Sequence, residues 1–462
     1  MSERLGVLLP SDVFPPRCGG AGWSAHTLAR ALIERNHAVV AIVPHRNAAP
    51  DRSATPPNAQ VLSEDVLGVP TVRVHYWAPK APFIQNYFRY ERFWPQLAQA
   101  IVDVAARIIH DPTSINSLII HAQHVQSAPA AIMAGRKLGA SVIITVRDHW
   151  PWDYFSTGLH ANRLPYPRQT WASLATDLVG RLGAVRGVLA LPAIPYMLAH
   201  VRRRQQALRQ ASAVIAVSDY MAERLAPIVA PERLHVIPNM VDLAAIDAAI
   251  ATPQTSMPTA TPYLMFVGKL ERNKGAHLLI EIFQELSRLQ VRIEDRGWRI
   301  EDGGRSILHP PSSILNLVIA GDGPLRADLE RELTALNVRV RCLDWIEHDE
   351  ALRLMANCEL LLFPSAWGEP LSRVPLEAGA CGAAVLAMPT GGTPDIIADG
   401  VNGALAATTA GFARRLAALL VDPAERRRLG AQARRHVEQR FAKDVVVHRF
   451  EQLYRETRLR GG

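Results

Sequence analysis

The chain has 462 residues, of which 48% are hydrophobic and 20% are charged. At about 150 residues per domain this length predicts two or three domains, and the ordinary globular composition excludes disorder of the whole chain. The net charge of +8 suits an anionic partner, which leaves nucleic acid, an acidic membrane surface and a phosphorylated ligand open. The four cysteines stand far apart and fit neither a zinc site nor a disulfide framework, so we expect a protein of the reducing cytoplasm.

The first half of the chain alternates short apolar runs with helix-like segments. Strands are expected at Leu5–Leu9, Ala38–Val43, Ser117–Ile120, Ser141–Val146, Ala213–Val217 and His235–Ile237, and helices at Ala21–Glu34, Trp94–Ile109 and Ser127–Leu138. Continuous apolar runs are typical of strands covered on both faces. The alternation predicts an α/β domain with a doubly wound, Rossmann-like parallel sheet over residues 1–245.

The stretch Ala249–Pro262 is rich in Pro, Thr and Ala and has neither charge nor periodicity, which predicts a linker at residues 246–262. The alternation then restarts, with strands expected at Tyr263–Val267, Asn316–Ala320, Arg339–Leu343, Leu360–Phe363 and Ala384–Ala387. We expect a second Rossmann-like domain over residues 263–440 and a C-terminal helix at 441–462 that packs back on the N-terminal domain. A charged, glycine-containing near-repeat interrupts this domain at 292–313, and it predicts a disordered insertion.

Chemistry-bearing residues gather where strands end. Gly19, Gly20 and Gly22 follow the first strand and open the first helix, where backbone amides favour an anion. In the second half, Gly268 with Lys269 and Lys274 leaves the first strand, and Gly321 leaves the next. Such strand ends line the ligand-binding crevice of open α/β sheets. Glu369 and Glu377 follow a later strand, and at 3.6 residues per turn a helix would bring both to a similar face.

These motifs, in this order, resemble family 4 retaining glycosyltransferases of the GT-B fold. The resemblance covers about 400 residues and rests on the following segments: Pro15–Gly22, Ala213–Ser218, Val236–Asp242, Gly268–Gly275, Gly321–Pro324, Glu369–Gly382, Gly391–Asp395 and Asp399–Gly403. It implies two Rossmann-like domains that face each other across a cleft, with the acceptor on the N-terminal domain (1–245) and the sugar nucleotide on the C-terminal domain (263–440). It further implies a nucleotide-diphosphate-sugar as donor and no metal or bound cofactor.

The resemblance also implies roles for individual residues. Glu377 would hold the ribose hydroxyls, Glu369 would face the transferred sugar, and Lys274 would bind phosphate. Lys269 stands where the family typically has arginine, so it keeps the charge but loses the bidentate contact. The diphosphate would rest on the backbone of Leu371, Ser372 and Arg373, on the Gly268 and Gly321 loops, and, from the other domain, on Gly19, Gly20 and Gly22.

One catalytic position departs from the family pattern. A histidine is often found directly after the strand that ends at Val146, but this chain has Arg147 there and His149 two positions later. Either residue could act at the sugar, or His149 could be a structural loop residue. The sequence leaves these alternatives open.

The sequence does not identify the acceptor beyond a hydroxyl group of a sugar, glycan or glycolipid. We expect the enzyme to act in cell-envelope or lipid-linked glycan synthesis. Eight aromatic residues between Tyr76 and Trp94 alternate with basic ones, and the apolar stretch Gly187–His200 runs into Arg202–Arg204. These segments suit either a packed core or the anionic inner face of a membrane. No stretch reaches the about 20 apolar residues of a spanning helix.

The arginines are too dispersed for a nucleic-acid-binding module. A GT-B-fold epimerase or hydrolase is the alternative function.

Overall fold

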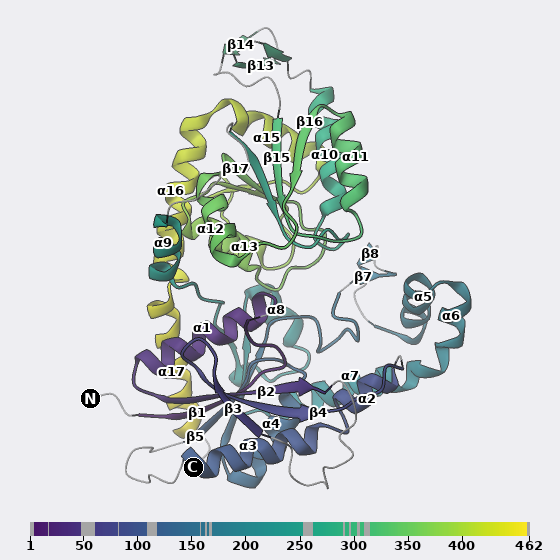
Figure 1. Ribbon diagram of the computed structural model, residues 1–462, viewed down its shortest axis with the longest axis vertical. Coiled ribbons are helices and arrows are strands. Elements are labelled where there is room, and N and C mark those ends of the chain that lie inside the picture. Colours follow the sequence, from purple (N-terminus) through teal and green to yellow (C-terminus); the bar gives the residue numbers. More distant parts are fainter. Residues whose placement is uncertain are drawn as a thin grey trace. The chain divides into compact units, whose positions relative to one another are not determined.

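The computed structural model describes residues 4–16, 18–47, 61–81, 83–108, 118–157, 159–161, 164–165, 169–252, 262–289, 292–294, 297–302, 305–308 and 315–459. The chain forms two compact units. The N-terminal unit comprises Met1–Ala161, Tyr166–Met240 and Lys443–Gly462, and the C-terminal unit comprises Asn162–Pro165 and Val241–Ala442. Each unit is an α/β domain built on a largely or wholly parallel sheet, which confirms the predicted fold class (Figure 1).

The N-terminal unit contains an eight-stranded sheet. Its strands, in sheet order, are β10 (Leu234–Val236), β9 (Ala213–Ala216), β6 (Ser141–Val146), β5 (Leu118–Ala122), β1 (Gly6–Pro10), β2 (Ala38–Arg46), β4 (Pro70–Tyr76) and β3 (Val61–Asp65). All neighbours are parallel except β3, which is antiparallel to β4. Strands β3 and β4 were not predicted, because polar residues interrupt them and they lack the continuous apolar run of central strands.

The helices of this unit are α1 (Gly20–Glu34), α2 (Ile84–Arg89), α3 (Trp94–Ile108), α4 (Ala128–Leu138), α5 (Trp171–Leu182), α6 (Ala184–Leu189), α7 (Ile194–Gln210), α8 (Asp219–Leu225) and α17 (Lys443–Leu459). Short 3-10 helices occupy Leu191–Ala193 and Pro231–Arg233, and β7 (Leu159–His160) pairs with β8 (Leu164–Pro165). Figure 1 shows α1 on one side of the sheet and α3 and α4 on the other. This is the doubly wound arrangement that covers both faces of a parallel sheet.

The C-terminal helix α17 is part of the core of the N-terminal unit. Phe450 and Tyr454 are buried among residues of β1 and α1. The Tyr454 hydroxyl lies 2.7 Å from Nδ1 of His121 on β5, and Glu451 lies 3.0 Å from Nε2 of His37. The backbone N–H of Leu5 donates to Nδ1 of His37, so Nε2 carries the proton that Glu451 accepts. Burial and these polar contacts hold the end of the chain on the N-terminal unit.

The C-terminal unit contains a six-stranded parallel sheet in the order β16 (Val338–Cys342), β15 (Leu315–Ala320), β11 (Leu264–Val267), β17 (Leu360–Phe363), β18 (Val385–Ala387) and β19 (Ala404–Leu405). Its helices are α9 (Leu243–Ala251), α10 (Ala276–Arg288), α11 (Arg326–Ala335), α12 (His348–Asn357), α13 (Arg373–Ala380), α14 (Thr393–Ile396), α15 (Thr409–Val421) and α16 (Pro423–Arg440). Apolar side chains of β11, β15, β17, α10 and α15 form one buried cluster.

Part of the predicted linker is helical. Its first residues belong to α9, whose start is capped because the Asp242 side chain accepts from the N–H of Ala245 at 3.2 Å. Alanine is the best helix former, and it occupies most positions of α9. Arg434 of α16 holds Asp247 of this helix with two hydrogen bonds of 2.7 and 2.9 Å. Residues 253–261 of the predicted linker lie outside the described residues.

The predicted disordered insertion contains a small antiparallel sheet. Its strands are β12 (Arg292–Glu294), β13 (Gly297–Asp302) and β14 (Arg305–Leu308), paired in the order β12-β13-β14. Figure 1 labels β13 and β14 of this sheet. Charge and glycine content favoured disorder, but in β13 the apolar Trp298 and Ile300 alternate with charged residues, which is the period of a strand. The remaining residues of 292–313 lie outside the described ranges.

One helical stretch, Ala184–Gln210, is long and apolar enough to cross a membrane by length and composition alone, in contrast to the expectation that no segment is. It comprises α6, a 3-10 turn and α7, and 28% of its most apolar window is buried in the protein. As a single such helix it is weak evidence for a span.

Candidate active site

Two glycine-bearing loops of the C-terminal unit pack against each other where β11 and β15 end. Gly268 has φ of 145° and Gly321 has φ of 148°. A Cβ on Gly321 would lie 2.0 Å from the carbonyl oxygen of Gly268. The N–H of Leu270 donates to the carbonyl of Asp322 at 3.0 Å. The structure therefore brings the predicted Gly268 and Gly321 together, and only glycine allows the two backbones this approach.

Lys274 and Glu369 form an ion pair in the same unit. The Lys274 Nζ lies 2.8 Å from Oε1 of Glu369, and the hydroxyl of Ser365 donates to the same oxygen at 2.7 Å. The Lys274 Nζ also lies 4.8 Å from the centre of the Trp367 ring. Glu369 is only 2% exposed. A buried carboxylate is stable when it is paired and hydrogen-bonded, and this one has both kinds of partner.

The backbone of Glu369 is fixed by a glycine turn that follows β18. Gly391 has φ of 57°, and a Cβ on it would lie 2.2 Å from the Glu369 carbonyl oxygen. That carbonyl accepts a hydrogen bond from the N–H of Gly392 at 2.7 Å. On the opposite side, the carbonyl of Asn273 accepts from the N–H of Ala366 at 3.0 Å. The Lys274 and Glu369 loops are thus held together through their backbones as well as through their side chains.

Glu377 has a different environment on α13. Its Oε1 accepts from Nε2 of His348 at 3.0 Å and from Nε of Arg373 at 2.9 Å. Burial by itself would raise the pKa of Glu377, but Arg373 and His348 outweigh it and hold this pKa at about 2. Burial lowers the pKa of His348, but the hydrogen bond and charge of Glu377 raise it overall. The carboxylate of Glu377 is therefore ionised and preorganised to accept hydrogen bonds.

The two glutamates do not share a helix, which corrects the spacing argument. Helix α13 begins at Arg373, so Glu369 lies in the loop before it. Pro370 follows Glu369 directly, and the residue before a proline is disfavoured in helical conformation. At the start of α13, Leu371 is buried and Ser372 is the N-cap without a side-chain hydrogen bond to the helix. The first N–H groups of α13 thus suit an anion.

The other predicted cation, Lys269, lies on the exposed part of the loop that follows β11. Its carbonyl accepts from the N–H of Glu271 at 2.8 Å, which turns the loop towards Lys274. Lys269 stays a prediction as a phosphate contact.

In the N-terminal unit, Gly19 is the exposed N-cap of α1, and no side chain caps this helix. Gly20 is the first residue of α1 and is also exposed. Gly22 is buried, and a Cβ there would lie 2.5 Å from the Sγ of Cys18. Gly19 and Gly20 at the start of α1 are accessible for an anion, whereas Gly22 is required for the packing of α1 against the preceding loop at Cys18.

Arg147 and His149 are both buried after β6. The Arg147 guanidinium donates to the carbonyl of Gln123 at 3.0 Å and to the side-chain oxygen of Asn239 at 3.1 Å. His149 is 2% exposed, and its ring lies 5.4 Å from that of Trp152. These contacts give Arg147 a role in fixing the loop. Which of Arg147 and His149 contacts the transferred sugar stays a prediction.

Sequence reasoning did not single out three partners of the predicted residues. Ser365 and Trp367 lie within the loop that carries Glu369, so proximity to that residue could have indicated them. His348 is 29 residues before Glu377, and no local signal links the two. The packing of α12 against α13 in the folded unit brings His348 to Glu377.

Comparison with known proteins defines the class. Two family models match: "Glycosyltransferase Family 4" over residues 18–245 and "Glycosyl transferases group 1" over residues 250–436. Solved structures with the same fold include Anabaena HepE in complex with UDP (TM-score 0.62, 17% identity, covering 98% of this chain and 100% of that one) and sucrose-phosphate synthase from Thermosynechococcus elongatus (0.60, 20%, 98% and 99%). The protein is thus a GT-B glycosyltransferase.

The chain belongs to glycosyltransferase family 4, whose enzymes act on nucleotide sugars. It is 29% identical to alpha-maltose-1-phosphate synthase of Mycobacterium tuberculosis over 54% of this chain, and the match spans 65% of that protein's length. It is 23% identical to one of the polypeptides of the phosphatidylinositol N-acetylglucosaminyltransferase of Arabidopsis thaliana, over 86% of this chain and 70% of that protein. It is also 23% identical to the lipopolysaccharide core biosynthesis glycosyltransferase LpsE of Rhizobium meliloti, over 61% and 74%.

Proposed function

We propose that the protein transfers a sugar from a nucleotide-diphosphate-sugar to a hydroxyl acceptor, with retention of configuration, in cell-envelope or lipid-linked glycan synthesis. The observation that carries the proposal is the pair of half-buried Lys274 with buried Glu369 next to the start of α13, with the ionised Glu377 on that helix. The set offers a cation, an uncapped helix N-terminus and two separately stabilised carboxylates, which are the groups that a diphosphate, a sugar and a ribose require.

The donor would be bound by charge at the diphosphate and by hydrogen bonds at its two sugars. Lys274 and the amides of α13 favour the negative charge that grows on the leaving diphosphate. Glu377 accepts from the ribose hydroxyls, and Glu369 accepts from hydroxyls of the transferred sugar. We propose that these groups supply the positive potential that a divalent metal supplies in other transferases.

Retention follows if the acceptor attacks from the side that the diphosphate leaves. The bond between the anomeric carbon and the diphosphate oxygen breaks, and the bond to the acceptor oxygen forms on the same face. The acceptor's proton passes to the departing phosphate oxygen. Glu369 then positions the sugar and forms no covalent bond, in keeping with its pairing to Lys274.

The test is a panel of UDP-, GDP- and ADP-sugars with a glycan acceptor extract, with product configuration read by NMR. The proposal is supported if the enzyme transfers the sugar of an α-linked donor into an α-linked product, and if the rate of transfer is the same in the presence of EDTA. Release of free sugar only, or an epimerised nucleotide sugar, would instead establish the hydrolase or the epimerase. The UDP complexes of the HepE structures make UDP-sugars the first donors to try.

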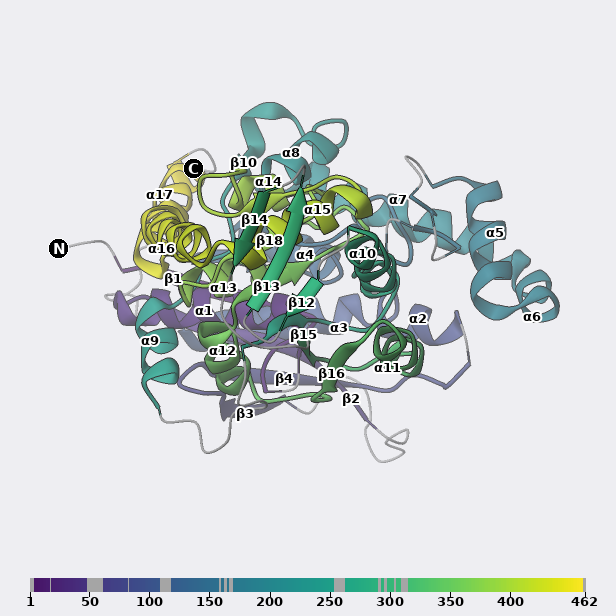
Figure 2. The same cartoon turned by 90° about the horizontal axis from the view of Figure 1, so that it is seen from above.

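We further propose that the protein works at the anionic inner face of a membrane. Figures 1 and 2 show α5 and α6 beyond the end of α7, at the edge of the N-terminal unit. Val185 and Leu189 are 75% and 76% exposed, and Arg186 lies between them. Apolar side chains next to arginines suit an anionic lipid surface. The phosphatidylinositol and lipopolysaccharide in the names of two relatives point the same way.

Flotation with vesicles tests this. The wild type should float with vesicles that contain phosphatidylglycerol and less with pure phosphatidylcholine. The variant Val185→Ser/Leu189→Ser should stay in solution, whereas the control Val445→Ser, at an exposed valine of α17, should float. Equal flotation of all three proteins would remove this surface from the proposal.

A further inference from the structure

Strand β10 forms one edge of the eight-stranded sheet and is paired on one side only, with β9. The N–H of Ile237, directly after β10, donates to the carbonyl of Ala216 in β9 at 2.9 Å. Backbone groups of successive strand residues point to opposite sides, so His235 also faces β9, whereas Leu234 and Val236 face away from the sheet. Within the described residues, the N–H groups of Leu234 and Val236 have no acceptor.

The opposite edge of the same sheet is protected against pairing. That edge is β3, where Glu64 and Asp65 are exposed charges, and charged side chains on an edge strand discourage the addition of another strand. The three residues of β10 are leucine, histidine and valine, without an acidic residue, a lysine or a proline. The sheet is therefore blunted at one edge and able to accept a further strand at the other.

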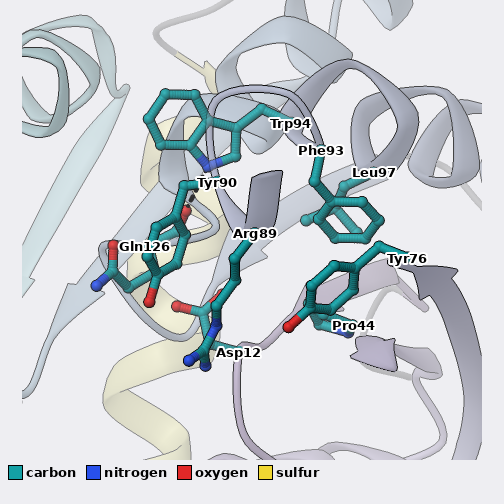
Figure 3. Close-up of a pocket in the computed structure, with 9 residues that line it drawn as sticks. All are labelled: Asp12, Pro44, Tyr76, Arg89, Tyr90, Phe93, Trp94, Leu97 and Gln126. Atoms are coloured by element: carbon teal, nitrogen blue, oxygen red, sulfur yellow. Dashed lines mark hydrogen bonds between the residues drawn. The ribbon is translucent and has the colours of Figure 1, made fainter. Parts of the chain in front are cut away.

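A groove of about 420 Å³ lies between β10 and the C-terminal helix α17, both labelled in Figure 2. The guanidinium of Arg449 reaches across it and donates to the carbonyl of Val236 at 2.5 Å. The small polar cavity at the carboxyl ends of the other strands (Figure 3) is a separate feature, because neither β10 nor α17 lines it. The residues that line the groove are Leu234, His235, Val236, Ile237, Arg449, Gln452, Leu453 and Glu456.

Helix α17 runs antiparallel to the strands that it covers. Ala442, just before the helix, forms a bridge with Val241, beyond the end of β10. Near the other end of the helix, the Thr457 carbonyl lies 3.5 Å from Oγ of Ser141, the first residue of β6. Arg449 and Glu456 are about two helical turns apart along this direction. Because Arg449 contacts Val236, Glu456 lies towards the start of β10.

This arrangement is self-complementary about a single two-fold axis. An axis that passes His235 would place Leu234 opposite Val236 of a second copy, where the outward N–H groups of both strands gain carbonyl acceptors. A carbonyl oxygen has two lone pairs, so Val236 can accept from the new strand and from Arg449. Because α17 is antiparallel to β10, the same axis would place Arg449 opposite Glu456 of the second copy. Such a surface matches itself in backbone polarity and in charge.

We propose that β10 and α17 form the interface of a symmetric dimer, in which β10 pairs antiparallel with β10 of a second copy. The two eight-stranded sheets then continue into each other, and the α17 helices lie side by side with opposite charges facing. An extended segment of another protein would satisfy the strand edge equally well, but it would give no reason for the paired placement of Arg449 and Glu456. The proposal is independent of the reaction that the protein catalyses.

Sedimentation velocity of the full chain over a range of concentrations tests the proposal. The wild type should have twice the 50.8 kDa mass of one chain. Val236→Pro removes an N–H that the ladder with β9 does not use, so it should weaken the dimer about 10- to 100-fold while thermal unfolding stays near that of the wild type. Glu456→Arg places like charges opposite each other at both symmetric contacts and should weaken the dimer by a similar factor.

A charge exchange and a matched control complete the experiment. Arg449→Glu/Glu456→Arg restores opposite charges and should recover most of the affinity that Glu456→Arg loses. Asp103→Arg on α3 is the control and should dimerise as the wild type does, because Asp103, like Glu456, accepts from a glutamine four residues earlier. If Val236→Pro fails to fold, the charge variants decide.

Three results would overturn the proposal. A monomeric wild type would do so, even if β10 captured an extended peptide instead. A dimer that Glu456→Arg and a folded Val236→Pro both leave intact would show that another surface is used. A charge-exchanged variant no tighter than Glu456→Arg would show that these two charges do not meet across the interface.

Discussion

Replacing Lys274 by methionine would leave the Glu369 carboxylate buried without its cation. The Glu369 side chain is 3% exposed and that of Lys274 is 27% exposed, at a distance of 2.8 Å. Removing one partner of a buried ion pair costs about 3–5 kcal/mol. Because water reaches the Lys274 end and Ser365 still donates to Glu369, we expect the free energy of unfolding to fall by about 2–3 kcal/mol, below that range.

Urea unfolding of four proteins measures the effect: wild type, Lys274→Met, Glu369→Gln and the double variant. The double variant should be more stable than Lys274→Met, because a neutral amide needs no cation. Lys443→Met is the control, since its pair with Glu34 has a 41% exposed carboxylate and should contribute less than about 1 kcal/mol. The reasoning fails if Lys274→Met loses no more stability than Lys443→Met, or if the double variant recovers none.

The same lysine should matter to turnover for a separate reason. Losing a cation that stabilises the leaving diphosphate is expected to lower kcat by about 100- to 1000-fold. Lys274→Arg keeps the charge and should retain most of the stability and part of the turnover. A Lys274→Met enzyme with wild-type kcat would show that the lysine serves only the fold.

Three further predictions concern the other site residues. Glu377→Gln should weaken donor binding about 10- to 100-fold in calorimetry. The folded pKa of Glu377, about 2, lies below the ordinary 4.5, so the stability that its carboxylate contributes is present above pH 4.5 and is lost as the pH falls towards 2. In urea titrations Glu377→Gln should not show this loss of stability. Gly391→Ala should lower turnover by displacing Glu369, whereas Gly400→Ala, also at positive φ but with open space around its Cβ, should not. Whichever of Arg147 and His149 acts at the sugar should, as the alanine variant, lose about 10- to 1000-fold in turnover without loss of nucleotide-diphosphate binding; full turnover in both variants would refute the placement of this loop.

The central strands were predictable because they are buried on both faces and read as continuous apolar runs. β6 and β17 were placed to the residue and β1, β5 and β11 within about two. β3, β4 and the strands of the 292–313 segment were missed for the opposite reason, because polar residues alternate with apolar ones there. Helix α9 was not predicted because it is short and runs directly into a Pro- and Thr-rich stretch, which obscures the capping signal of Asp242.

For the site, the order of motifs along the chain predicted which residues would lie together, and spacing alone predicted their geometry less well. Lys274 and Glu369 are 95 residues apart, yet both follow neighbouring strands of one parallel sheet, so their proximity is a property of topology. The partners of Glu377 are not readable in this way. Arg373 is one helical turn away, whereas His348 reaches Glu377 only through the packing of α12 against α13.

The separate environments of the two glutamates have a consequence for how the donor could bind. Glu369 shares its Oε1 with a lysine and a serine, both from loops, whereas Glu377 shares its Oε1 with an arginine of its own helix and a histidine of the preceding helix α12. If Lys274 binds the donor phosphate as proposed, it divides its charge between Glu369 and that phosphate, and the buried carboxylate orients the lysine before the donor arrives. Arg373 and His348 both donate to Glu377, so in the proposed arrangement the α13 amides and Lys274, with the predicted Lys269, contact the phosphate. A donor lacking the diphosphate should then lose most of its affinity, while one lacking the ribose hydroxyls should lose only the contribution of Glu377.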